Sequence, residues 1–269
     1  VSDTFKQKYE ENNQSYIFEY NYKDRLIVRM GYMFNYNSAG ERMANNTIKS
    51  NSFSIRAGLE SAGNVMYAIS NLTKQSKNSD GEYSLLSIPY AQYVKGDFDF
   101  SRNIVIDDKN AIAYHVGVGI AVPYGNSKSI PYIKQYFSGG ANSVRGWSVR
   151  ELGPGSFPGD GNYLNQSGDI KFDASIEYRS KLFWLLQGAL FVDAGNIWTI
   201  KEYENQPGGQ FDISKFYKQI AFAYGLGIRI DLDYLVFRID GGMKALNPAY
   251  SSGKQRYPIL NPNFKRDFT

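Results

Sequence analysis

The chain alternates apolar and polar residues over segments that are long for β-strands. In residues 112–122, six apolar side chains at every second position are separated by small or polar ones. Side chains of a strand point alternately to its two faces, so such a segment is apolar on one face only. We predict a strand for each of ten segments: 14–22, 25–37, 50–60, 64–72, 91–105, 111–123, 168–180, 183–198, 217–231 and 234–246.

The length of these segments separates two all-β classes. Strands of soluble sandwiches usually have about 5–6 residues. Most of the predicted strands have about 10–13, the length that crosses a bilayer at a tilt. Their polar faces carry charges and glycines, as the lumen of an outer-membrane barrel does. We therefore predict an all-β chain that forms part of a transmembrane antiparallel up-and-down β-barrel.

The connections between the segments also alternate in length. Long polar connections are expected at 38–49, 73–90, 124–167, 199–216 and from 247 on, and short turns such as 61–63 and 107–110 separate them. Outer-membrane barrels have short periplasmic turns and longer surface loops. We expect the long connections on the cell surface.

The composition makes several other classes of protein improbable. The 269 residues include no Cys and one His, so no disulfide, metal or cofactor is expected. The net charge of +4 comes from dispersed basic residues, which does not indicate nucleic-acid binding. A run of 18 apolar residues is absent, so no transmembrane helix is expected. His115 is the single candidate general base, and no nucleophile is identifiable beside it, so an enzyme is not expected.

The longest predicted loop contains the most distinctive motif. Residues 139–155 read GGANSVRGWSVRELGPG, with two arginines beside aromatic and apolar residues. A loop of about 40 residues without regular structure is uncommon in a compact domain and usually has a function.

The motif resembles loop 6 of the Omp85 family of outer-membrane barrels, which includes the BamA- and TamA-type insertases. The matching residues are Val144, Arg145, Gly146 and Trp147, and segments 176–179 and 191–198 resemble the two strands that follow. The resemblance covers about 110–246 and is nearest to the TamA-like proteins of Bacteroidetes. It implies a sixteen-stranded barrel, of which residues 1–269 would be one part. Strands at both ends and the preceding POTRA domains would lie outside the chain.

The resemblance also implies that this loop folds into the barrel, where its arginine meets acidic residues of the wall. Alternation places Asp193 and Glu177 on polar faces, so we predict that Arg145 pairs with Asp193 and lies near Glu177. A guanidinium suits this role because it is always charged and offers a planar fork of donors. Several glycines are expected to assist. Gly139, Gly140, Gly146 and Gly153 belong to the loop, and Gly117, Gly119, Gly225 and Gly227 either make room for it or relieve strand curvature.

The function implied by the resemblance is assembly of proteins into the outer membrane of a Gram-negative bacterium. The expected partners are the outer-membrane lipid bilayer, unfolded outer-membrane or exported proteins, and periplasmic or lipoprotein accessory subunits. Nucleic acid is not among them. Three alternatives stay open at this point: a two-partner-type secretion pore, a passive porin, and a barrel enzyme built around His115.

Overall fold

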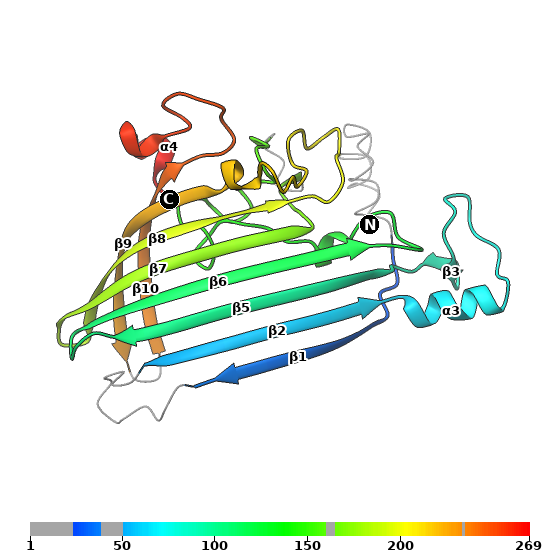
Figure 1. The fold of residues 1–269 in the computed structure, drawn as a ribbon, viewed down its shortest axis with the longest axis horizontal. Coiled ribbons are helices and arrows are strands. Elements are labelled where there is room, and N and C mark those ends of the chain that lie inside the picture. The colour runs from blue at the N-terminus through cyan, green and yellow to red at the C-terminus, as the bar shows by residue number, and fades with distance from the viewer. Residues whose placement is uncertain (1–23, 39–50, 160–164, 233–234) are drawn as a thin grey trace, which may run out of the picture.

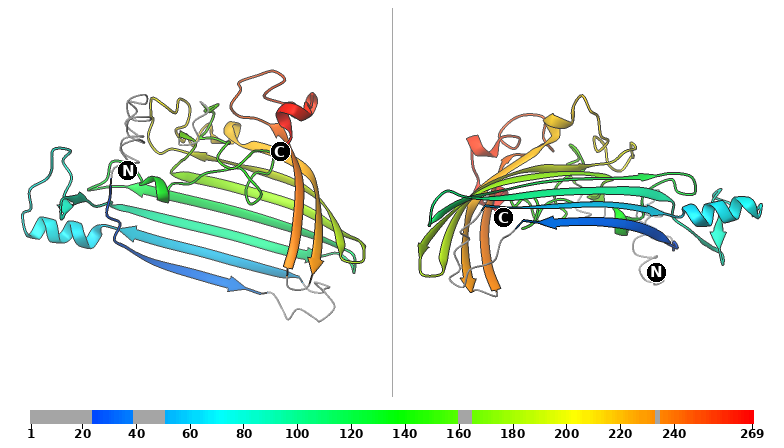
Figure 2. Two further views of the ribbon diagram at one scale, coloured as in Figure 1. Left: turned by 180° about the vertical axis from the view of Figure 1, so that it is seen from behind. Right: turned by 60° about the horizontal axis from the view of Figure 1, so that its bottom comes forward.

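The computed structural model describes residues 24–38, 51–159, 165–232 and 235–269. Its main feature is one antiparallel sheet of eight strands, each paired with the next along the chain (Figure 1). The strands are β1 (Arg29–Asn37), β2 (Ser52–Ala62), β5 (Tyr93–Val105), β6 (Asn110–Pro123), β7 (Ile170–Phe183), β8 (Leu186–Trp198), β9 (Ala221–Leu232) and β10 (Leu235–Leu246). The sheet curves around one face, as the wall of a barrel does (Figure 2).

The remaining elements are short and lie outside the sheet. They are α3 (Asn64–Leu72), the hairpin of β3 (Ser84–Leu85) and β4 (Ile88–Pro89), η1 (Tyr132–Lys134), η3 (Phe216–Gln219), η4 (Pro258–Leu260) and α4 (Phe264–Asp267). In the part of the chain described by the structure, no helix has the length and apolarity needed to cross a membrane. After α4, Phe268 forms an antiparallel bridge with Met243 on β10.

The structure confirms the all-β, up-and-down class and eight of the ten predicted strands. The predicted strand 14–22 lies outside the described residues. Among the residues that are described, β1 and β10 are the two edges of the sheet, so the barrel is present as an open wall.

The prediction of a strand at 64–72 is wrong, because these residues form helix α3. Gly63 ends the preceding strand with a left-handed φ of 75°, which a residue with a side chain rarely adopts. Residues 65–70 alternate only weakly, because Met66 and Ala68 stand at the positions where a half-buried strand would have polar residues. Spacing by three and four residues fits the same segment, and its burial follows that helical spacing.

The helix changes which end of the sheet each connection occupies. Ala62 and Tyr93 are paired neighbours, so residues 63–92 form a single connection at the end where the long loops lie. The predicted short turn at 61–63 is therefore at the long-loop end. Asn37 and Ser52, which flank the predicted loop 38–49, lie at the short-turn end. The predicted loop 38–49 itself lies almost entirely outside the described residues.

The convex face of the sheet is apolar and exposed, as the alternation predicts. Residues such as Leu59, Phe98, Val118 and Leu226 point outward from four different strands. Toward the short-turn end, the rings of Tyr36, Phe53, Phe100 and Tyr114 form a ladder across β1, β2, β5 and β6, with centroids 5.4, 6.4 and 5.9 Å apart. Aromatic girdles of this kind border the lipid-facing band of outer-membrane barrels.

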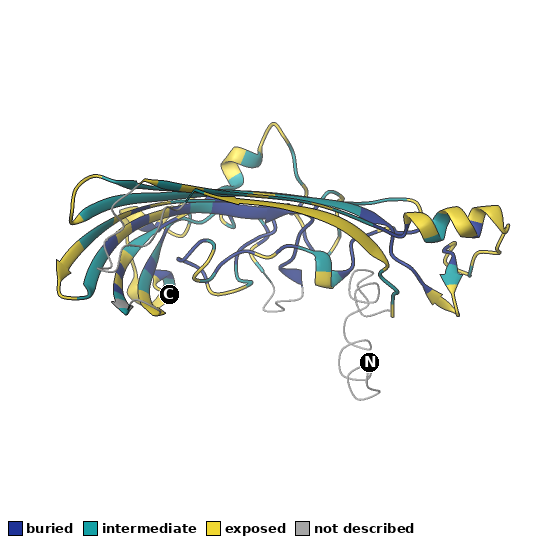
Figure 3. Ribbon diagram, turned by 90° about the horizontal axis from the view of Figure 1, so that it is seen from below, coloured by how far each residue is buried: buried dark blue, intermediate teal, exposed yellow. Residues whose placement is uncertain are grey.

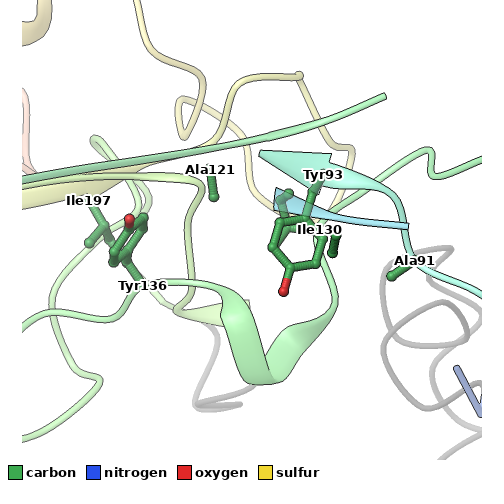
Figure 4. Packing of buried hydrophobic residues seen from close by; sticks show 7 residues of the cluster. Ala91, Tyr93, Ala121, Ile130, Tyr136 and Ile197 are labelled. Carbon is green, nitrogen blue, oxygen red and sulfur yellow. The ribbon is translucent and has the colours of Figure 1, made fainter. Parts of the chain in front are cut away.

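The concave face is covered by the described residues of the β6–β7 connection, 124–159 and 165–169, which we call the lumen loop (Figure 3). Its first part packs on the wall through a buried apolar cluster, in which Ile130 and Tyr136 of the loop gather with Tyr93, Ala121 and Ile197 of the strands (Figure 4). The loop is therefore part of the packed interior and does not extend freely from the strand ends.

Candidate functional site: the docked lumen loop

The lumen loop is fixed first at its base, on β2 and β5. The hydroxyl of Tyr136 donates a hydrogen bond to Asp97 at 2.7 Å, and the ammonium of Lys95 lies 3.9 Å from the Tyr136 ring centroid. Lys134 forms an ion pair with Glu60 at 2.7 Å. These contacts hold residues 132–136 against the wall, and the chain then crosses to the opposite part of the sheet.

The tip of the loop is fixed by its apolar motif residues. Val144 and Trp147 are almost fully buried and pack with Leu152 against Ala221 and Ala223 of β9. Small residues on the wall leave space for the large indole. The alternation of β9 makes this possible because the residues on its concave face from 221 to 227 are all Ala or Gly.

Arg145 lies between these two apolar residues and points into the wall. Its Nε and one terminal nitrogen each donate to Asp193 at 2.8 Å, in the two-pronged geometry that carboxylates favour. The backbone N–H of Arg145 donates to the same carboxylate at 3.0 Å. Asp193 is completely buried and Arg145 is 8% exposed, so this pair is shielded from water.

The guanidinium of Arg145 also belongs to a closed ring of charges. Its remaining terminal nitrogen donates to Glu177 at 2.7 Å and to Asp240 at 3.2 Å. Arg229 contacts the same two carboxylates, at 2.7 and 3.0 Å. Two buried cations therefore share two carboxylates, and the third carboxylate, Asp193, pairs with Arg145.

The ring joins four consecutive strands through one loop residue. Glu177 lies on β7, Asp193 on β8, Arg229 on β9 and Asp240 on β10. At the margin of the cluster, Arg179 pairs with Glu177 and Arg238 pairs with Asp240, and both arginines are about one-third exposed. The cluster thus links the loop tip to the whole second half of the described sheet.

An aromatic ring completes the surroundings of the guanidinium. The central carbon of Arg145 lies 3.4 Å from the centroid of the Phe191 ring, on the same face of β8 as Asp193. Cation–π contacts are strongest where the cation is desolvated, as here. Gly225 makes room for Phe191, because a Cβ at that position would lie 2.4 Å from the ring.

The environment keeps Arg145 charged. Burial alone would lower the pKa of its guanidinium, but the hydrogen bonds that it donates to Asp193 and Glu177, with the negative charge of these groups, outweigh burial and raise the pKa above its usual value. Removing one partner from a buried ion pair typically costs about 3–5 kcal/mol, because the other charge is left without compensation. The cluster therefore stabilises the docked loop only while every charged member is present.

Glycines in the loop allow its tight course. Gly139 and Gly140 have φ of 96° and 85°, and the N–H of Gly140 bonds the carbonyl of Trp147 at 2.7 Å to close the tip. Gly153 has φ of 81°, and a Cβ there would lie 2.4 Å from the side-chain oxygen of Asn196 on β8. These positions require glycine because other residues rarely adopt a left-handed backbone.

Gly146 lets the tip touch the backbone of β10. A Cβ at Gly146 would lie 2.8 Å from Ala223 and 3.2 Å from the nitrogen of Lys244. In the reverse direction, a Cβ at Gly242 would lie 2.2 Å from the carbonyl oxygen of Arg145. The hydroxyl of Thr269 donates to the carbonyl of Gly146 at 3.2 Å, so the residues after α4 also contact the tip.

A second ionic contact lies at the outer side of the tip. Lys244 of β10 pairs with Glu151 at 2.7 Å, and its ammonium lies 5.4 Å from the centroid of a Trp147 ring. Glu151 also accepts a hydrogen bond from the backbone of Ser148 at 2.7 Å. The loop is thus joined to β10 on both sides of Trp147.

The wall glycines separate into two groups. Gly119 makes room for the loop, because a Cβ there would lie 2.5 Å from the Tyr136 ring. The other three make room for side chains of the wall. These are Asp173 beside Gly117, Phe191 beside Gly225, and Asp240 beside Gly227.

We expect Gly119→Ala to loosen the loop base without releasing the tip. The new methyl group must displace the Tyr136 ring, and overpacking of this kind costs about 1–3 kcal/mol. Chymotrypsin should then cleave after Tyr136 faster than in the parent protein, while Trp147 stays protected. Equal cleavage rates at Tyr136 in the two proteins would contradict this.

The remaining sequence candidate, His115, lies on the concave face between two carboxylates. One ring nitrogen is 3.2 Å from Asp99 and the other is 3.3 Å from Asp173. Both ring nitrogens are therefore within reach of a carboxylate. Across the described ranges, no group of three or more His, Asp and Glu is placed to hold a metal ion.

Comparison with known proteins assigns the chain to a family. A family model described as the Omp85 superfamily domain matches residues 3–257. The chain belongs to the Omp85 superfamily. The outer membrane protein assembly factor BamA of Neisseria meningitidis is 35% identical over 97 residues, which are 33% of this Omp85 chain and 12% of the relative. The mouse sorting and assembly machinery component 50 homolog is 25% identical over 166 residues, or 56% of this chain and 34% of the relative.

Among solved structures, BamA from Haemophilus ducreyi lacking POTRA domains 1–3 aligns with a TM-score of 0.46 and 16% identity, over 81% of this chain and 51% of that one. The matched regions therefore span about a tenth to a half of these relatives. The family and the BamA relative place this Omp85 chain in the outer membrane of a Gram-negative bacterium, as a β-barrel protein.

The structure brings the predicted site residues together and adds others. Arg145 contacts Asp193 and Glu177, and the motif residues around it form the tip. Sequence analysis missed the part played by Asp240, Arg229 and Phe191. A signal for Asp240 was present, because Arg238, Asp240, Gly242 and Lys244 alternate along one face of β10.

Proposed function

We propose that this chain forms the wall and lumen loop of a barrel that inserts other β-barrel proteins into the outer membrane. The relatives support this, since those reported above carry the names of assembly factors and assembly machinery. They are assembly factors rather than enzymes, and we propose the same for this chain. Accessory subunits in the periplasm or on lipoproteins would deliver unfolded substrates to it.

The observation that carries the proposal is the docked tip of the lumen loop. A passive porin needs an aqueous channel, whereas here the concave face is occupied by a loop fastened at two places. The loop bridges β7 to β10 through the Arg145 cluster and reaches β2 and β5 through residues 132–136. In a barrel that opens to admit a substrate, these contacts of the lumen loop would keep the remaining strands of the wall aligned.

The test is depletion of the full-length protein in its own bacterium, followed by quantification of outer-membrane proteins. We expect many β-barrel proteins to fall together, because an insertion factor serves a class of substrates. Complementation with Arg145→Ala should fail, and complementation with Arg150→Ala should succeed. Arg150 is a suitable control because it is an arginine of the same loop whose guanidinium lies near rings of the loop itself, those of Tyr132 and Phe137.

Two other outcomes would replace the proposal. Loss of one secreted protein, with membrane proteins unchanged, would indicate a secretion pore. A steady open conductance in planar bilayers that is unaffected by Arg145→Ala would indicate a porin.

A further inference from the structure

Helix α3 carries an exposed face that is entirely apolar. Val65, Ile69 and Leu72 are 61%, 50% and 83% exposed, and Ala68 between them is exposed as well. Spacings of three and four residues place these side chains on one side of a helix. The helix itself contains no charged residue.

The polar side chains of α3 lie outside this apolar face and form hydrogen bonds with the protein. Ser70 is buried and accepts a hydrogen bond from Tyr90 at 3.1 Å, and Asn71 accepts one from Tyr83 at 3.1 Å. A helix on the surface of a water-soluble protein shows the opposite arrangement, with its apolar side inward. The strands of this sheet have the same inverted polarity, because their apolar side chains face outward.

The position of α3 makes its apolar face continuous with the lipid-facing surface. The helix begins two residues after β2 ends, at the long-loop end of the sheet. Seen from below, it lies in the same layer as the strands, whereas the β3–β4 hairpin lies on the inner side (Figure 3). The outward-facing Leu59 of β2 is 60% exposed and precedes the helix by one short turn.

The apolar band on β5 is short without the helix. On the outer face of β5, Arg102 is followed by Phe100, Phe98, Gly96 and Val94 up to the strand end. A charged residue is tolerated on the lipid side near an interface, so Arg102 marks the inner boundary. From Phe100 to Val94 the strand advances by six residue steps. At about 3.3 Å a step and a tilt of about 40°, these steps cover about 15 Å of the membrane normal. Barrel bands are about 25 Å tall, and nine helical residues add up to about 13 Å.

We propose that α3 is a lipid-facing helix that extends the band along the strand direction, with its Val65–Ile69–Leu72 face in the outer leaflet of the membrane. Lys74 and Lys77 follow directly and are exposed, which places two cations where anionic lipid headgroups would lie. Apolar side chains favour the acyl region, and lysines favour the level of anionic headgroups. The helix completes the lipid-facing band above β2 and β5.

The sequence contains no Cys, so single cysteines report on defined positions. We would introduce Ile69→Cys, Leu72→Cys, Leu59→Cys and Ser76→Cys separately into the full-length protein and attach an environment-sensitive fluorophore. The proteins would be reconstituted into phosphatidylcholine–phosphatidylglycerol vesicles with and without brominated acyl chains. Leu59 on β2 is the positive control, and Ser76, exposed beyond the helix, is the matched negative control.

Bromine should quench the labels at Ile69 and Leu72 as strongly as the label at Leu59, with blue-shifted emission, and leave the label at Ser76 bright. All four side chains are exposed, so the variants should fold, which heat-modifiable migration on gels would check. Labels at Ile69 and Leu72 that behave like Ser76 would overturn the proposal. Energy transfer between labelled copies without quenching by bromine would also overturn it, in favour of a second copy as the occupant.

Discussion

Arg145→Ala should release the tip of the lumen loop and abolish complementation. The substitution leaves three buried carboxylates facing one buried arginine, and removal of one partner from such a cluster costs about 3–5 kcal/mol. That corresponds to a loss of about a hundredfold or more in the docked fraction, at 1.4 kcal/mol for each factor of ten. Trp147 is 2% exposed when docked, so chymotrypsin cleavage after this residue measures the release directly.

Reversing the charges of Arg145 and Asp193 together should not restore docking. An acidic side chain at 145 would face Glu177 and Asp240, which hold the guanidinium in the parent protein. Arg145→Lys should also fail in large part, because a single ammonium cannot reproduce the fork on Asp193 and the contact with Phe191. Recovery by the double reversal would show that the pair acts alone and that the ring with Arg229 is incidental.

Gly242→Ala should release the tip almost as completely as loss of Arg145. The added methyl group would lie 2.2 Å from the carbonyl oxygen and 2.7 Å from the carbonyl carbon of Arg145. Backbone atoms cannot rotate away as the end of a flexible side chain can, so the tip as a whole must move. The expected readouts are rapid cleavage after Trp147 and loss of complementation.

Gly241→Ala is the matched control on the opposite face of β10. Its methyl group would lie 3.1 Å from the end of the Phe268 ring, which can shift slightly. We expect the tip to stay protected and the protein to complement. If Gly241→Ala and Gly242→Ala behave alike, the effect comes from the strand and not from contact with the loop.

Alternation predicted most of the fold because side-chain direction in a strand is a local property. It placed Asp193 and Glu177 on the concave face, and together with the family resemblance it identified Arg145 as their partner. The contact of Arg145 with Asp240, 95 residues away, depends on how β9 and β10 pair, which no short segment encodes. The alternation could have indicated Asp240 as a lumen residue, but not its distance from the loop.

The error at 64–72 has a similar origin. In a membrane protein, both a strand and an inverted helix can present apolar residues outward, and a short apolar segment fits either period. The decision between them comes from Gly63, whose left-handed backbone ends β2, and from the hydrogen bonds of Ser70 and Asn71 with tyrosines of the following hairpin.

The ring of charges around Arg145 also depends on the register between β9 and β10. If β10 slipped by one residue against β9, Asp240 would turn to the lipid side and Ile239 would face the loop, because a strand reverses its faces at every residue. Arg145 and Arg229 would then lose a shared carboxylate at the same time. Docking of the tip is thus possible only when four strands are correctly aligned. Arg145 precedes all four strands in the chain, so its complete set of contacts can form only after the last of them, β10, has paired with β9.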